Sequence, residues 1–132
     1  MRFSNHPLLK SVPAVLMMIA IFLFSARPSI DEPSNIWLHI ISKAGHVIGY
    51  AMLTLSLWRG FAFNAKRIWL AWLLALLYAI TDEYHQSFVP GRHPAFFDVV
   101  VYDNLGALIS VWFAGRFSKQ KQPVGNGLVV NS

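Results

Sequence analysis

Four long apolar stretches constrain this chain more than any other feature of its sequence. A helix needs about 20 mostly apolar residues, within a range of roughly 17–25, to cross the hydrocarbon core of a bilayer. The sequence therefore predicts an all-α fold, a polytopic membrane domain over residues 1–117 with four transmembrane helices. We place the spans at about residues 8–26, 44–63, 68–88 and 95–117. Residues 118–132 are polar, with Gly and without periodicity, which predicts a flexible tail.

The composition supports lipid rather than water as the solvent around these helices. Only 13% of the residues are charged and 55% are hydrophobic, whereas a soluble domain carries about 25% charged residues. The chain has no Cys, which excludes disulfide frameworks, thiolate metal sites and cysteine nucleophiles. A cleaved signal peptide is the alternative for the first stretch. Cleavage needs small residues, however, and Phe24 stands two residues before Ala26, so we expect an uncleaved anchor.

The basic residues predict how the helices are oriented. Cytoplasmic loops of membrane proteins carry an excess of Lys and Arg. Eight of the eleven basic residues fall in the amino-terminal segment, the second loop and the carboxyl-terminal tail: Arg2, Lys10, Arg59, Lys66, Arg67, Arg116, Lys119 and Lys121. All six acids fall on the opposite side, with Arg27, Lys43 and Arg92. We therefore expect both termini in the cytoplasm, and the net charge of +5 reports topology, not nucleic-acid binding.

A polar stripe begins the second span. Residues three and four apart share a helix face, so His46 lies above Tyr50 and beside Lys43. Such residues are costly inside a membrane and usually face a cavity or a partner. The alternatives are an interfacial histidine bonded to a loop and a lysine that only anchors the helix end. Gly45 and Gly49 form a Gly-xxx-Gly pair, which predicts close approach of another helix.

The third span ends in the segment Thr81-Asp82-Glu83-Tyr84-His85-Gln86. Adjacent carboxylates at the bilayer edge repel each other and lose hydration, which favours a cation, a proton or a metal ion nearby. Helical spacing places Asp82 with His85 and Gln86, and Glu83 beside Gln86. An acidic helix end without function is the alternative, although carboxylates at a helix C-terminus oppose the helix dipole.

The third loop and the fourth span complete the polar set. Pro90-Gly91 indicates a tight turn that holds Arg92 close to the acids, where its guanidinium can pair with a carboxylate or grip a phosphate. Asp98 stands near the start of the fourth span. Asp103 lies deeper, where we expect it to turn inward toward His46, Arg92 or an ion. A structural ion pair is the alternative for Arg92, and a buried structural hydrogen bond for Asp103.

These motifs together resemble the VanZ-like family of small polytopic membrane proteins. The residues that carry the resemblance are Lys43-xx-His46-xxx-Tyr50, Asp82-Glu83-xx-Gln86-x-Phe88-x-Pro90-Gly91-Arg92, Asp98 and Asn104-Leu105-Gly106-Ala107, with Phe24-Ser25 at the first helix end. Similar members place an Asn or Asp four residues after the first aspartate of the fourth helix. Here Asp103 follows Asp98 by five. Either the helix contains a one-residue bulge, or Asp98 is not the equivalent aspartate in space.

The resemblance implies a multi-pass protein of the bacterial cell (inner) membrane, in a family named after a protein associated with resistance to the glycopeptide teicoplanin. Our first hypothesis is a binder of membrane lipid or of a lipid-linked envelope molecule, with the polar cluster on the extracytoplasmic side. Lys43 and Arg92 would hold a phosphate, while the acids and Gln86 would bind polar groups. The candidate ligand-binding residues are Lys43, His46, Tyr50, Asp82, Glu83, Gln86, Arg92, Asp98 and Asp103.

Two other hypotheses remain open. The first is a small membrane hydrolase or transferase in which Asp82 or Glu83 is the general base and His46 the acid. A divalent metal ion would suit its oxygen and nitrogen ligands, with His46, Asp82, Glu83 and His85 as candidates. The second is proton or ion passage, which is weaker because the inner halves of the helices offer no continuing polar path.

Overall fold

The computed structural model describes residues 7–28, 36–92 and 95–120, which form an all-helical bundle. The helices are α1 (Pro7–Ser25), α2 (Ile36–Gly60), the short 3₁₀ turn η2 (Ala65–Arg67), α3 (Ile68–Gln86), α4 (Phe96–Asp98), the π-helical turn η3 (Val99–Asp103) and α5 (Asn104–Gln120). The last three follow one another without a break, so α4, η3 and α5 act as one long helix.

The helix bounds differ from the predicted spans by two or more residues at four places, one of which is the end of the second helix at Gly60, three residues before the predicted end. The second helix begins at Ile36, eight residues before the predicted start, because the polar pair Ser42-Lys43 does not interrupt helical geometry. The third ends at Gln86, before the turn at Pro90-Gly91. The fourth continues to Gln120, so residues 118–120 are helical rather than part of a flexible tail. Residues 121–132 lie outside the described part of the chain.

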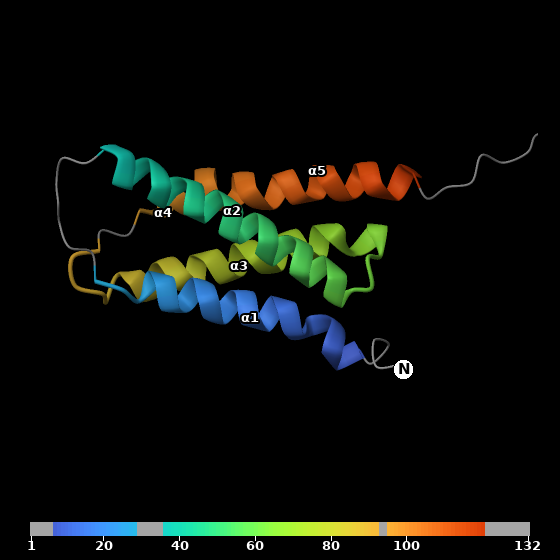
Figure 1. Cartoon of the computed structure of the whole chain (residues 1–132), viewed down its shortest axis with the longest axis horizontal. Helices are drawn as coiled ribbons and strands as arrows, with labels where there is room; N and C mark the ends of the chain where they lie inside the picture. Colours follow the sequence, from blue (N-terminus) through green and yellow to red (C-terminus); the bar gives the residue numbers. More distant parts are fainter. Residues whose placement is uncertain (1–6, 29–35, 93–94, 121–132) are drawn as a thin grey trace, which may run out of the picture.

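The chain runs back and forth along the bundle (Figure 1). The start of α1, the connection between α2 and α3 and the end of α5 lie at one end of the molecule. The end of α1, the start of α2, the end of α3 and α4 lie at the other. Helix α2 crosses the bundle and contacts α1, α3 and α5, so residues along its length can meet side chains from each of them.

The α2–α3 connection is a compact turn built by its own residues. Ala62 and Phe63 have φ angles of 54° and 55°, a left-handed conformation that reverses the chain after α2. Trp58 Nε1 donates to the carbonyl of Asn64 at 2.9 Å, and the Asn64 side chain accepts from the Lys66 N–H at 3.0 Å. This turn fixes α2 against α3 at the end of the bundle opposite to the polar cluster.

Small side chains let the helices pack closely. Ala71, Ala75 and Ala79 recur every four residues along α3 and are buried. Gly106 of α5 is the tightest position, because a Cβ atom there would lie 2.1 Å from the carbonyl oxygen of Val47 on α2. Ser110, one turn further, donates to the Ala51 carbonyl at 2.8 Å. Close backbone approach and hydrogen bonds between helices are typical of packing in membranes.

The outer surface of the bundle is apolar. Large side chains such as Leu16, Ile48, Leu77 and Ile109 are about half exposed, and a soluble monomer rarely presents so much contiguous apolar surface. By length and composition, the helices Ile36–Gly60 and Phe96–Ser118 can each cross a membrane. Much of the apolar surface of these helices is left exposed by the rest of the described chain. Lipid can cover such a surface, which indicates a membrane protein.

Candidate functional site

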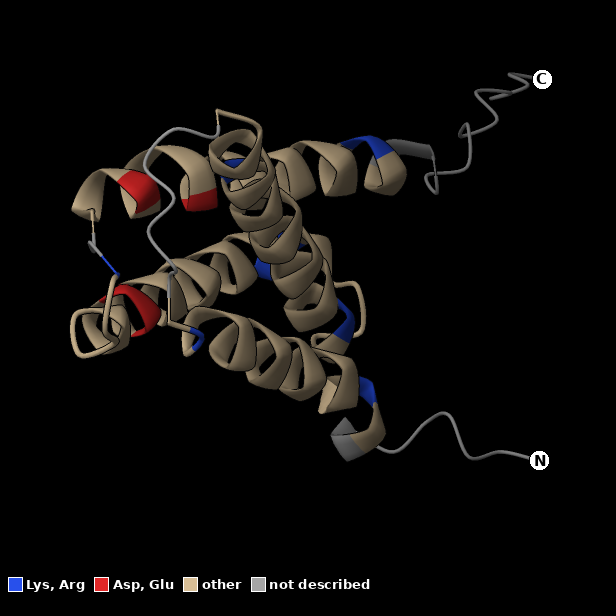
Figure 2. Cartoon of the chain, turned by 60° about the vertical axis from the view of Figure 1, so that its left-hand side comes forward, with Lys and Arg blue, Asp and Glu red and all other residues tan. Residues whose placement is uncertain are grey.

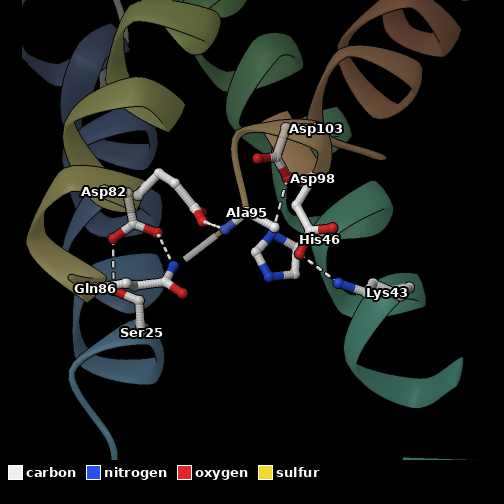
Figure 3. A network of polar contacts seen from close by, with 9 residues as sticks. Ser25, Lys43, His46, Asp82, Gln86, Ala95, Asp98 and Asp103 are labelled. Atoms are coloured by element: carbon white, nitrogen blue, oxygen red, sulfur yellow. Dashed lines mark hydrogen bonds and ion pairs between the residues drawn. The ribbon is translucent and has the colours of Figure 1, made fainter. Parts of the chain in front are cut away.

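The acids of the described chain gather at one end of the bundle (Figure 2). Asp82 and Glu83 come from α3, Asp98 ends α4 and Asp103 ends η3. The end of α1 and the first turns of α2 complete this end of the molecule. Every one of these acids is partnered by another residue of the described chain, and the partners decide which groups remain available for a ligand (Figure 3).

Asp82 is buried, with 4% of its surface exposed, and both carboxylate oxygens are occupied. Ser25 at the end of α1 donates its hydroxyl to Oδ1, and Gln86 Nε2 donates to Oδ2 at 3.0 Å. This network ties α1 to α3, as Figure 3 shows. A buried carboxylate needs hydrogen bonds to replace those it loses with water, and Ser25 and Gln86 supply them to Asp82.

His46 and Lys43 of α2 each pair with an aspartate of the long helix that α4, η3 and α5 form together. His46 Nδ1 lies 2.9 Å from Oδ1 of Asp103, and Lys43 Nζ forms an ion pair with Asp98. Asp103 is 1% exposed. The Lys43 ammonium also lies 5.2 Å from the ring centroid of Tyr102. The two pairs stand one helical turn apart on α2, because Lys43 and His46 are three residues apart.

The π-helical turn explains how both aspartates reach α2. Within η3 the Asn104 N–H bonds to the carbonyl of Val99, five residues earlier, instead of four. One extra residue is therefore accommodated between Asp98 and Asp103. Of the two alternatives left open by the spacing, the structure shows the bulge, and Asp98 and Asp103 both face α2.

The side chains of Glu83 and Arg92 form hydrogen bonds with backbone groups. The Ala95 N–H donates to Glu83 Oε1, which ties the end of α3 to the start of α4. Arg92 donates from Nη2 to the Phe24 carbonyl at 3.1 Å and from Nε to the Arg27 carbonyl at 3.2 Å. Of the two roles left open for Arg92, pairing with a neighbouring carboxylate does not occur among the described residues. Arg92 thereby caps the carboxyl end of α1, where the Phe24 carbonyl also accepts from the Arg27 N–H at 3.4 Å.

A cavity of about 500 Å³ opens between α1 and α2 at this end of the bundle. Its polar part is lined by Ser25, His46, Tyr50, Asp82, Gln86 and Arg92. Its apolar part extends along both helices and includes Met17, Ala20, Ile21, Ile48 and Met52. Four of the predicted ligand-binding residues do not line the cavity: Lys43, Glu83, Asp98 and Asp103.

Gly45 and Gly49 line this cavity and do not contact another helix backbone. An added Cβ would meet nothing within 4 Å at Gly45, and only Ile21 Cγ1 at 3.9 Å at Gly49. The interpretation of the pair as a helix-packing motif is therefore wrong. The missing side chains leave room beside α1, whereas the close approach that the sequence suggested occurs at Gly106.

The remaining predicted residues have structural surroundings. Tyr50 is buried and stacks with His46, with ring centroids 6.4 Å apart. His85 packs against Phe22 at 4.4 Å, and its buried Nδ1 has no hydrogen-bond partner in the described chain. The metal candidates His46, Asp82, Glu83 and His85 do not converge: the described residues contain no group of three or more His, Asp or Glu side chains arranged to hold a metal ion.

Comparison with known proteins shows the family to which the chain belongs. The model of the family described as VanZ/LLP1 matches residues 7–118. The chain belongs to the VanZ/LLP1 family. The match includes every residue that lines the cavity and both aspartates of the fourth helix. No curated protein and no solved structure matches this VanZ/LLP1 chain.

Three residues important to the site carried no functional prediction: Ser25, which holds Asp82; Gly106, which brings α5 onto α2; and Asn104, whose Oδ1 accepts from Trp72 Nε1 at 3.0 Å. All three stand in segments that carry the resemblance to VanZ/LLP1 proteins. Their residue types gave a usable signal, since small or hydrogen-bonding residues within apolar helices often mark helix contacts.

Proposed function

We propose that this VanZ/LLP1 protein crosses the bacterial inner membrane four times and binds a lipid-like amphiphile in the cavity between α1 and α2. The headgroup would occupy the polar part of the cavity in the extracytoplasmic leaflet, and the hydrocarbon chain would lie along the apolar part. Binding of a lipid-linked envelope molecule in this way would alter susceptibility to glycopeptides such as teicoplanin.

The observation that carries the proposal is the division of the cavity into a polar and an apolar part. From Ser42 to Met52, α2 lines it over about 15 Å, at roughly 1.5 Å per residue. The polar lining of Ser25, Gln86 and Arg92 lies where α1 and α3 end, whereas Met17 and Met52 line the cavity further along α1 and α2. A water-soluble ligand gains little from the apolar walls, whereas an amphiphile matches both parts.

The charges of the polar end favour an anionic headgroup. Asp82 already accepts from Ser25 and Gln86, and Lys43 is paired with Asp98 behind the cavity. Arg92 is the lining cation, and no ion pair of the described residues includes it, because the lining carboxylate of Asp82 bonds to Ser25 and Gln86 instead. The carbonyls of Phe24 and Arg27 fix its guanidinium in place. A preorganised guanidinium matches the geometry of a phosphate.

The proposed orientation is supported by the distribution of charge along the bundle. Lys10, Arg59, Lys66, Arg67 and Arg116 belong to the end that carries the start of α1, the α2–α3 turn and the end of α5. The described acids belong to the opposite end (Figure 2), where Ser25, Asp82 and Gln86 line the cavity. An excess of basic residues marks the cytoplasmic side, so the cavity would open in the outer leaflet.

The test is a binding measurement on the full chain in nanodiscs of neutral lipid, with dodecylphosphonate as the probe. Gly45 lines the cavity and a Cβ there meets nothing within 4 Å, so Gly45→Leu should fill part of the cavity and weaken binding by about tenfold or more, equivalent to about 1.4 kcal/mol. Gly115→Leu is the matched control, since Gly115 also has nothing within 4 Å and does not line the cavity.

Equal binding by the Gly45→Leu variant and the wild type would overturn the location of the site. A dodecyltrimethylammonium probe that binds as tightly as dodecylphosphonate would overturn the preference for an anion. In cells, the wild-type chain should change teicoplanin susceptibility and Arg92→Ala should abolish that change. A response that survives both Gly45→Leu and Arg92→Ala would separate any resistance effect from the cavity.

A further inference from the structure

We infer that the cavity is also a hydrolytic site, in which His46, positioned by Asp103, acts as the general base on a phosphodiester in the headgroup of the bound amphiphile. This inference rests on the proposed function, because it requires the headgroup to lie in the polar part of the cavity. It adds a reaction and assigns it to a residue pair that binding alone does not need.

The geometry of His46 is that of a base oriented by a carboxylate. Its Nδ1 lies 2.9 Å from Asp103 Oδ1, and the ring lines the cavity. A neutral imidazole that donates from Nδ1 to a carboxylate presents the lone pair of Nε2 on the other side of the ring. Among the described residues, Nε2 has no hydrogen-bond partner, so this lone pair is available to a molecule in the cavity.

The carboxylates predicted from sequence as bases are already engaged. Both oxygens of Asp82 accept hydrogen bonds from Ser25 and Gln86. Glu83 accepts from the Ala95 N–H and does not line the cavity. His46 is therefore the better base, with its orientation fixed from behind by a carboxylate that is itself 1% exposed.

A binding site for an anion gains nothing from Asp103. A buried carboxylate costs free energy through lost hydration, and its negative charge opposes an anionic ligand. Behind an imidazole that accepts a proton during a reaction, the same carboxylate stabilises the imidazolium that forms. The location of Asp103 is thus accounted for by proton transfer and not by recognition of the headgroup.

Arg92 restricts the class of substrate. It is the cavity's lining cation and has no ion-pair partner among the described residues, so it can pair with the single negative charge of a phosphodiester. Its guanidinium would hold the non-bridging oxygens and stabilise the charge that develops on them as water adds to phosphorus. Arg92 would contact the substrate directly, whereas Asp103 acts through His46 and is a positioning residue.

The step balances without a further reactant. Nε2 of His46 takes a proton from water as the water oxygen bonds to phosphorus. The bond between phosphorus and the leaving-group oxygen then breaks, and His46 returns its proton to that oxygen. One water is consumed, and the products are a phosphate monoester and an alcohol, with His46 neutral again.

The experiment uses the full chain in neutral nanodiscs with dodecyl 4-nitrophenyl phosphate, a single-chain phosphodiester whose hydrolysis releases 4-nitrophenol, which then ionises in the buffer to coloured 4-nitrophenolate. His46→Gln should lower kcat by about 10²–10⁴-fold, the usual contribution of a general base. Asp103→Asn should lower kcat by about 10²-fold or more with KM nearly unchanged, because it removes the orientation of the base. Thr81→Ala, an exposed residue of α3 outside the cavity, is the control.

Binding of dodecylphosphonate, which has no ester bond to break, reports folding and recognition separately. Binding by the His46→Gln variant with loss of release supports the inference, and restoration of release to a His46→Gly variant by added imidazole supports it further. Binding by the wild type without release overturns the inference and leaves the proposed function standing. Release that survives His46→Gln overturns the assignment of the base, and failure of the wild type to bind the phosphonate overturns both proposals.

Discussion

Asp103 reaches Nδ1 of His46 because it ends a π-helical turn over Val99–Asp103. In a regular α-helix, two residues five apart would point about 140° away from each other, since each residue turns the helix by about 100°. The wider turn over Val99–Asp103 removes this difference, so that Asp98 meets Lys43 while Asp103 meets His46. Extra residues of this kind often occur at functional sites.

Deletion of Val100 should therefore be tolerated. Val100 is half exposed and belongs to the π turn, and its removal leaves Asp98 and the following aspartate four residues apart, the spacing of one α-helical turn. Both pairs with α2 can then form in an uninterrupted α-helix. We expect the variant, purified in detergent, to unfold within a few degrees of the wild type.

Insertion of one Ala after Val99 provides the opposing variant. It adds about 100° of rotation and separates one of the two pairs from α2. Loss of one partner of a buried pair costs about 3–5 kcal/mol, so this chain should unfold at a much lower temperature. If the deletion destabilises the protein as much as the insertion does, the π turn has a role other than phasing the two aspartates.

Gly106→Ala should destabilise the bundle. The new Cβ would lie 2.1 Å from the Val47 carbonyl oxygen, which is backbone and cannot move aside without displacing α2. Overpacking of this kind costs about 1–3 kcal/mol or more. Gly115→Ala is the matched control, because nothing lies within 4 Å of its position and Ala favours a helix. Thermal unfolding in detergent measures both, and an unchanged midpoint for Gly106→Ala would contradict the close α2–α5 contact.

Much of the fold follows from the sequence because lipid imposes simple length and charge rules. The apolar stretches predicted an all-helical chain, and the first predicted span, about residues 8–26, corresponds closely to α1. The start of α2 could not be placed, since Lys43 looks like an interfacial residue until its partner Asp98 is known. The partner lies 55 residues away, and no local rule connects the two.

The candidate site was predicted as a set of residue types but not as an arrangement. Spacing along one helix correctly joined His46 to Tyr50 and Asp82 to Gln86, since these relations are local. Contacts between helices could not be read in this way. Arg92 was expected to face acids but binds carbonyls of α1, and Gly45 was expected to face a helix but faces the cavity. Helix rotation, set by the packing at positions such as Gly106, decides these contacts.

Ser25→Ala should lower stability through Asp82. The buried carboxylate would lose the hydroxyl that donates to Oδ1 and keep only the bond from Gln86. An unsatisfied buried acceptor costs about 1–3 kcal/mol, and more when it is charged. Ser87→Ala is the control, because Ser87 is exposed and its hydroxyl bonds only to the Tyr84 carbonyl of its own helix. A Ser25→Ala chain that unfolds at the same temperature as Ser87→Ala would show that Asp82 finds another donor.

The Lys43–Asp98 pair should show measurable coupling. The two side chains are 20% and 16% exposed, so the pair is less screened than one on an open surface. In a double-mutant cycle with Lys43→Met and Asp98→Asn, we expect a coupling free energy of about 1–3 kcal/mol, from unfolding in detergent. Fully exposed pairs give about 0.2–1 kcal/mol. A value in that lower range would show that the pair does not hold α4 against α2.

The proposed orientation can be tested directly because the 132-residue chain has no Cys of its own. Ser87, after the end of α3, and Ala65, in the turn between α2 and α3, are both exposed and lie at opposite ends of the bundle. In intact cells, a membrane-impermeant maleimide should label a Ser87→Cys chain and leave an Ala65→Cys chain unlabelled. Permeabilised cells are the control for thiol reactivity, and there both variants should react. The orientation follows from the excess of Lys and Arg at the Ala65 end, so labelling of Ala65→Cys alone in intact cells would reverse it and place the cavity in the cytoplasmic leaflet.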